Sequence, residues 1–175
     1  MTAKKRTAAL IVTGAATAAI CLVMNLWLLP LIEQTTNGLR CFDMNSLGYT
    51  HAQAKEFLSL LSERGRDVYL HVQLPLDFVY PVAYTAFFML AMRALTGKNT
   101  PWYALPAALA ALDYTENVCS IVMLRAMDVS PALAGFASTV TVIKSALMTL
   151  TFIVLLIMLI RYFIKRRKGA AKETN

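Results

Sequence analysis

The segment 102–127, WYALPAALAALDYTENVCSIVMLRAM, is long enough to cross a lipid bilayer, yet it carries acidic residues near its middle. A helix rises about 1.5 Å per residue, so about 20 apolar residues span the hydrocarbon core. A charge at that depth costs roughly 2.5–3.5 kcal/mol and usually faces a protein interior or a wet cavity. Asp113 and Glu116 therefore predict a membrane helix whose polar face is turned toward other helices.

Apolar segments of similar length lie on both sides of this one. Of the 175 residues, 58% are hydrophobic, whereas a soluble domain is about 45–50% apolar. The excess is concentrated in four blocks, which predicts an all-α, polytopic membrane protein with a four-helix transmembrane bundle as its single domain over 1–175. The predicted spans are about 7–31, 68–95, 102–127 and 131–163.

The outer loop 33–67 is the only long connection between the predicted spans. Thr50 and Gln53 match a capping box, in which each side chain can bond to the backbone of the other. The short amphipathic helix that they begin is expected over 51–64, lying on the membrane surface or closing the mouth of the bundle. Cys41 in the same loop is predicted to be an exposed thiol that could pair with another chain.

Lysine and arginine are distributed unequally between the two sides of the predicted bundle. Eleven lie on the side of the two termini, which includes the basic tail 164–175, and five lie on the side of the long loop. The positive-inside rule predicts that both termini are cytoplasmic, in a multi-pass protein of the cell inner membrane. These charges flank membrane spans, so we expect membrane lipids as partners and no nucleic acid.

Polar residues in three of the spans fall on single faces of their helices. The second span has an acid and two tyrosines on one stripe, and the third has two acids and an amide on another. The fourth span carries Lys144 at about the depth of Asp113, because the two spans are antiparallel neighbours. The predicted ligand-binding residues are Asp77, Tyr80, Tyr84, Asp113, Glu116, Asn117 and Lys144.

Several functions are compatible with this cluster. Three carboxylates face one lysine, so either a carboxyl is protonated or a cation completes the site. We favour an outward-facing polar cavity that binds a lipid or another amphiphilic small molecule. The alternatives are an intramembrane enzyme that uses Asp113 or Glu116 as acid or base, and an accessory protein whose ion pairs are only structural. A proton-coupled transporter would work as a homodimer, for which Gly14 and Ala18 offer a face of small residues.

Motifs of other functional classes do not occur in the sequence. It contains no glycine-rich phosphate loop, no HExxH and no CxxC, and two histidines are too few for a three-histidine zinc site. We therefore expect no metal and no cofactor, and no catalytic residue is assigned.

One pattern of residues covers most of the chain: Gly48-Tyr49, Gly65-Arg66, Tyr69, Asp77, Pro81, Tyr84, Asp113, Glu116-Asn117 and Lys144. It resembles a group of uncharacterised bacterial four-span membrane proteins and implies no activity. The four spans, the outer-loop helix, Leu74-Pro75 and Pro81, and the basic tail are also similar to the EXPERA domain of sterol isomerases and the sigma-2 receptor. That resemblance implies a carboxylate-lined cavity for cationic amphiphiles or sterols, with Asp77, Asp113 and Glu116 in its wall.

Overall fold

The structure is a computed structural model that describes residues 3–126 and 128–173. Nearly all of these residues are helical and none lies in a strand, so the predicted all-α class is confirmed. Four segments are long and apolar enough to cross a membrane, which fits a multi-pass membrane protein. They are Lys4–Thr36, Glu63–Thr96, Pro101–Arg125 and Pro131–Lys168.

The first two of these segments are assembled from several helical pieces. The first contains α1 (Ala3–Val23), a π-helical turn (Met24–Leu28), α2 (Leu29–Glu33) and a 3-10 turn (Gln34–Thr36). The second contains α4 (Glu63–Val68), a π-helical turn (Tyr69–Gln73) and α5 (Leu74–Thr96). A 3-10 turn (Pro101–Tyr103) precedes α6 (Ala104–Arg125), and the fourth segment is α7 (Pro131–Glu173).

A proline explains each of the two π-helical turns. Pro30 and Pro75 are the second residues of α2 and α5, so each lies two residues beyond the end of a π-helical turn. A proline has no backbone N–H, and its ring collides with the carbonyl group four residues earlier, so the preceding turn widens. The two turns pack against each other, and the wide parts of the two segments therefore meet at one level of the molecule.

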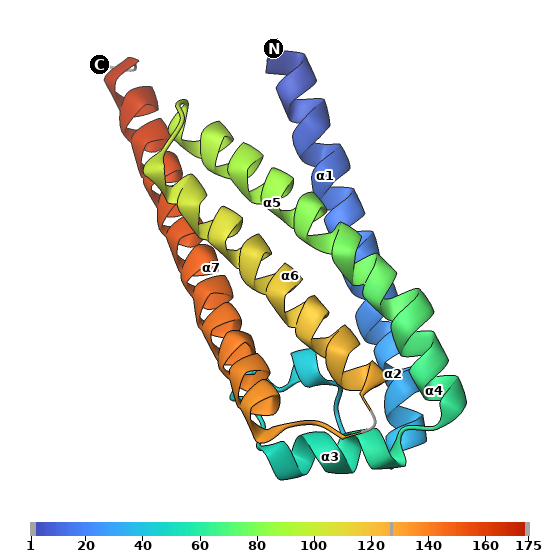
Figure 1. Cartoon of the computed structure of the whole chain (residues 1–175). Helices are drawn as coiled ribbons and strands as arrows, with labels where there is room; N and C mark the ends of the chain where they lie inside the picture. The colour runs from blue at the N-terminus through green and yellow to red at the C-terminus, as the bar shows by residue number, and fades with distance from the viewer. Residues whose placement is uncertain (1–2, 127, 174–175) are drawn as a thin grey trace.

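The long helices pack mainly against their neighbours in the chain (Figure 1). α5 contacts α1, α6 and α7, and α6 also contacts α7. Among the described residues, α1 and α7 do not form one of the closely packed pairs. Both termini lie at one end of the molecule, and α3 (His51–Leu60) lies at the other (Figure 1).

The small-residue face of α1 is partly used inside the chain. A Cβ atom placed on Gly14 would lie 3.0 Å from the Phe87 ring of α5, so the two helices approach closely at this glycine. Ala18 on the same face is exposed. Gly14 therefore packs within the chain, which leaves less of this face for a second copy, and the homodimer stays a prediction.

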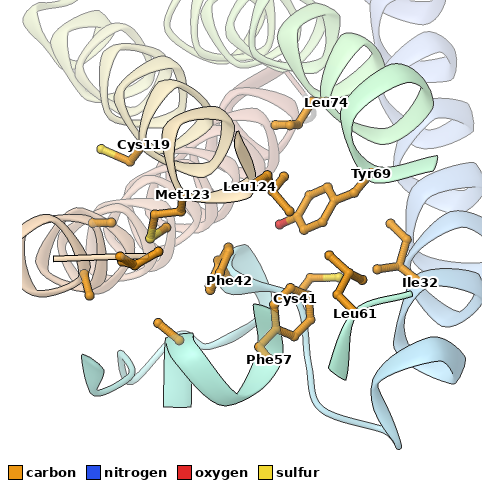
Figure 2. Close-up of a cluster of buried hydrophobic side chains, with 14 of the residues drawn as sticks. Ile32, Cys41, Phe42, Phe57, Leu61, Tyr69, Leu74, Cys119, Met123 and Leu124 are labelled. Carbon is orange, nitrogen blue, oxygen red and sulfur yellow. The ribbon is translucent and has the colours of Figure 1, made fainter. Parts of the chain in front are cut away.

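An apolar core lies where the outer loop and α3 cover the ends of the long helices (Figure 2). The rings of Phe42 and Phe57 are centred 4.9 Å apart, and those of Phe57 and Tyr69 are 6.3 Å apart. Cys41 lies in this core with 0% exposure, so the predicted exposed thiol is wrong. The next residues form the 3-10 turn Phe42–Met44, in which Phe42 is buried. Burial, assisted by the nearby Asp43, raises the pKa of the Cys41 thiol.

Helix α3 begins at the predicted capping box. Thr50 Oγ1 accepts from the backbone N–H of Gln53, and Gln53 Oε1 accepts from that of Thr50 at 2.8 Å. The helix ends at Leu60, earlier than predicted, because Ser62 begins a second helix, α4. The Ser62 hydroxyl accepts the backbone N–H of Gly65 at 3.0 Å. The second membrane-length segment thus begins nearer to α3 than the hydropathy pattern indicated.

Gly48 and Tyr49 hold the outer loop against α7. The backbone N–H of Tyr49 donates to Ser138 Oγ at 2.8 Å. Gly48 has a φ of +88°, and a Cβ atom there would lie 2.8 Å from the same oxygen, so glycine satisfies both the dihedral and the close approach. His51 Nε2 lies 2.6 Å from the carbonyl oxygen of Val129. These contacts fix the loop beside the polar cluster of the bundle.

Candidate functional site

A lysine and two carboxylates form the centre of the site. Lys144 Nζ lies 2.9 Å from Asp113 Oδ1 and also donates to Glu116 Oε2. The side chains of Lys144, Asp113 and Glu116 are 15%, 6% and 1% exposed. The contact between α6 and α7 agrees with the similar depths that antiparallel neighbours predict for Asp113 and Lys144. The two acids share one base inside the bundle.

Hydroxyl groups bond to the remaining oxygens of these two acids. Tyr84 of α5 donates its O–H to Asp113 Oδ2 at 2.6 Å. Thr141, one turn before Lys144 on α7, donates to Glu116 Oε1. Each carboxylate oxygen then has a donor, and this part of the site is a closed network that joins α5, α6 and α7. A buried ion pair of this kind holds helices in one mutual orientation more than it adds net stability.

Asn117 joins α6 to α5 through a carbonyl group that a proline leaves unbonded. Its Nδ2 donates to the backbone oxygen of Asp77 at 3.2 Å. Pro81, four residues further along α5, has no N–H to give to that oxygen. The Asn117 amide therefore replaces a missing helix hydrogen bond, as neighbouring helices commonly do around membrane prolines.

Two further acids lie in the same region without a basic partner among the described residues. The Asp77 side chain belongs to a residue that is 6% exposed, and no described side chain donates a hydrogen bond to it. Asp43, in the turn Phe42–Met44, accepts a hydrogen bond from the Tyr69 O–H at 3.3 Å. Burial raises the pKa of the Asp43 carboxyl, and the charge of Lys144 opposes this rise. These two acids are the open part of the site.

A cavity of about 320 Å³ lies at the open acids. Its charged lining consists of Asp43, Asp77, Asp113 and Lys144, and Tyr80 adds a phenol ring. The other lining residues, from the first segment, the loop and α7, are mostly small polar residues and methionines. Methionine is flexible and adapts to partners of different shape. The cavity thus combines an acidic end with an adaptable apolar wall.

The structure brings the seven predicted site residues into one region, in two groups. Asp77, Tyr80, Asp113 and Lys144 line the cavity. Tyr84, Glu116 and Asn117 are buried behind it and bond to protein groups. The second group therefore positions the first, and only the first is open to a ligand in this conformation.

Asp43 is the charged lining residue that the sequence reasoning missed. An irregular loop has no periodicity from which to place a side chain, and the only signal is that Phe42 and Met44, both bulky and apolar, flank it. The sequence predicts that the amphipathic helix lies on the membrane surface or closes the mouth of the bundle. None of the described lining residues comes from α3, which packs behind Phe42, so the loop borders the cavity instead.

Some buried polar atoms near the cluster have no hydrogen bond to a described protein group. They are both amide atoms of Gln73, which lies one turn before Asp77 with 0% exposure, and the hydroxyl of Tyr49. An unpaired buried group costs about 1–3 kcal/mol, so such groups are rare and often functional. The region around the cavity therefore contains more hydrogen-bonding groups than the described protein groups satisfy.

The acids do not form a metal centre in the described part of the chain. No three of its His, Cys, Asp and Glu side chains are placed together so that they could hold a metal ion.

Comparisons with protein-family models, with curated proteins and with solved structures find no match for this chain. The resemblances to bacterial four-span proteins and to the EXPERA domain therefore stay predictions. Because a fold alone does not define an activity, function has to be inferred from the geometry of the site.

Proposed function

We propose that this integral membrane protein binds an amphiphilic small molecule, with the polar head in the cavity at Asp43 and Asp77. The observation on which the proposal rests is the Asp77 carboxylate, which is buried, lines the cavity and has no hydrogen-bond donor among the described side chains. Leaving a carboxylate in that state is costly. A head group that donates hydrogen bonds or carries positive charge would remove the cost.

The balance of charge favours a cationic head. Lys144 lines the same cavity, but Asp113 and Glu116 share it, so two carboxylates offset its single positive charge. Asp43 and Asp77 add acidic groups to the same cavity without adding a base. An amine or ammonium group between them would stabilise their ionised forms.

The shape of the cavity favours an amphiphile with a slender tail. Small-molecule sites measure about 300–1,000 Å³, and a volume of about 320 Å³ holds a small head with part of one chain. Met24 and Leu29 from the first segment and Met148 from α7 supply apolar wall. α1 and α7 are not a closely packed pair, and the proposal is that the tail leaves toward lipid between them.

The orientation follows from the distribution of basic residues. By the positive-inside rule we propose that the protein lies in the cell inner membrane with both termini in the cytoplasm, and that the loop and α3 lie outside. α3 then lies at the outer surface of the bundle with its buried face on Phe42. The cavity would open in the outer half of the bilayer.

Two of the three alternative uses of the cluster, the structural network and the enzyme, fit less of the geometry. A purely structural network explains Asp113, Glu116 and Lys144, in which every carboxylate oxygen is bonded, but it does not explain Asp77. An acid–base enzyme would use Asp113 or Glu116, and both are already paired with Lys144.

The test uses the full chain in nanodiscs and three molecules with the same chain: dodecylamine, dodecanol and dodecanoate. We expect dodecylamine to raise the thermal unfolding midpoint saturably and more than the other two. Asp77→Asn should weaken its apparent affinity at least about tenfold, a change of about 1.4 kcal/mol. Asp67→Asn is the matched control, because Asp67 is exposed on α4. Equal responses to the three molecules, or equal responses of the two variants, would contradict the proposal.

A further inference from the structure

A groove of about 530 Å³ lies at the end of the bundle that carries the termini. It forms where α7 passes the turn between α5 and α6 (Figure 1). Lys98, Arg161 and Lys165 line it, and no acidic residue does. None of the three forms an ion pair with an acid in the part of the chain that the structure describes. The groove is therefore a concentration of uncompensated positive charge.

The α7 wall of the groove changes from apolar to basic along one face. Val154, Ile157, Met158, Arg161 and Lys165 follow one another at intervals that keep them on the same side of the helix. Over this stretch the helix rises about 16 Å. A phospholipid has the same order of groups, since its acyl chain lies toward the membrane centre and its phosphate at the surface.

Aromatic side chains mark the level of the basic residues. Trp102 and Tyr162 belong to the same groove and are 47% and 37% exposed. Tryptophan and tyrosine concentrate where hydrocarbon meets head groups. The long side chains of Arg161 and Lys165 can extend from an apolar helix toward that level. Lys98 reaches it from the turn between α5 and α6.

We propose that this groove binds an anionic glycerophospholipid, with the phosphate among Lys98, Arg161 and Lys165 and one acyl chain along Ile157 and Met158. Charge complementarity selects this occupant, because basic pockets beside membrane helices attract anionic head groups. A zwitterionic lipid is a poorer fit, since its ammonium group adds positive charge to a groove that has no acid. The site does not depend on the amphiphile cavity, whose lining residues are different and lie closer to α3.

Native mass spectrometry of the full chain tests the proposal by counting retained lipids. We expect the wild type to retain one phosphatidylglycerol in preference to phosphatidylcholine. The triple variant Lys98→Gln, Arg161→Gln, Lys165→Gln should weaken that affinity at least about tenfold. The control Arg166→Gln, Arg167→Gln, Lys168→Gln removes the same charge from exposed positions of α7 outside the groove and should retain the lipid. Raising the salt concentration should weaken retention of phosphatidylglycerol by the wild type.

Three outcomes would overturn the proposal. Equal losses in the two triple variants would show attraction to net charge without a defined site. Equal retention of phosphatidylcholine would show an apolar crevice with no selection by charge. Displacement of phosphatidylglycerol by inorganic phosphate alone would show a site for a free anion and not for a lipid.

Discussion

At the scale of single residues, Lys144 is the base that compensates both Asp113 and Glu116. Removing one partner of a buried ion pair leaves an uncompensated charge and costs about 3–5 kcal/mol. We expect Lys144→Met to lower the free energy of unfolding in mixed micelles by about this amount. Glu116→Gln in the same chain should recover part of the loss, since it removes one of the two orphaned charges. Additive losses in the double variant would contradict the network.

Asp43 predicts how stability depends on pH. Burial raises the pKa of this carboxyl above its ordinary value of 3.8, the charge of Lys144 lowers it, and Asp113 adds a smaller rise. Above 3.8 the unfolded chain releases this proton while the folded chain keeps it, so stability falls as pH rises through the folded-state pKa.

Asp43→Asn should remove this part of the pH dependence. It should also stabilise the protein at pH values above the folded-state pKa of this carboxyl. The measurement is the thermal unfolding midpoint as the pH is raised from the ordinary pKa of 3.8 toward neutrality. Glu56→Gln, at an exposed position of α3, is the control and should keep the wild-type slope. A variant at Asp43 that keeps this slope would show that the carboxyl titrates in the same range in the folded and unfolded chains.

At the scale of helices and loops, the sequence predicts local properties well and tertiary ones poorly. Length and hydropathy are local, so the four spans were predictable. The pairing of Asp113 with Lys144 was also predictable, because depth follows from the helical rise and from antiparallel neighbours. Pro30 and Pro75 indicate that the regular helix is interrupted near them. The sequence does not say whether the interruption is a kink or a π-helical turn, because a proline can cause either. The position of Asp43 depends on its neighbour Phe42, which packs into a core built from distant segments. No local sequence pattern predicts that contact.

Gly48 tests whether the outer loop is held by its contact with α7. Gly48→Ala introduces a Cβ atom 2.8 Å from Ser138 Oγ and places alanine at a φ of +88°. Gly97→Ala is the matched control, because its φ is +74° but no atom lies within 4 Å of the added carbon. Both variants should suffer backbone strain of about 1–3 kcal/mol, and only the first should displace the loop.

Maleimide labelling of Cys41 reports that displacement, because this thiol belongs to the loop and is buried in the apolar core. In chains with Cys21→Ala and Cys119→Ala, we expect labelling to be faster for Gly48→Ala than for Gly97→Ala. The same rate in both variants would mean that the loop is held by its core contacts and not by Ser138.

At the scale of the whole molecule, the acidic cavity and the basic groove lie at different levels along the bundle axis. The cavity that contains Asp43 and Asp77 lies toward α3, and the groove with Arg161 and Lys165 lies toward the termini. If the positive-inside rule holds, the acidic cavity faces the outer leaflet and the basic groove faces the anionic cytoplasmic leaflet. One topology therefore determines which molecules can reach each site.

Cysteine accessibility in intact cells tests that topology. In a chain with its native cysteines replaced by alanine, Leu47→Cys lies in the outer loop at a position that is 96% exposed, and Lys168→Cys lies on the basic end of α7. An impermeant maleimide should label Leu47→Cys in intact cells and Lys168→Cys only after permeabilisation, while a permeant maleimide should label both. The reverse pattern would place the acidic cavity in the inner half of the bilayer. The basic groove would then face the outside, where the surface potential that favours anionic lipid at the cytoplasmic face does not act.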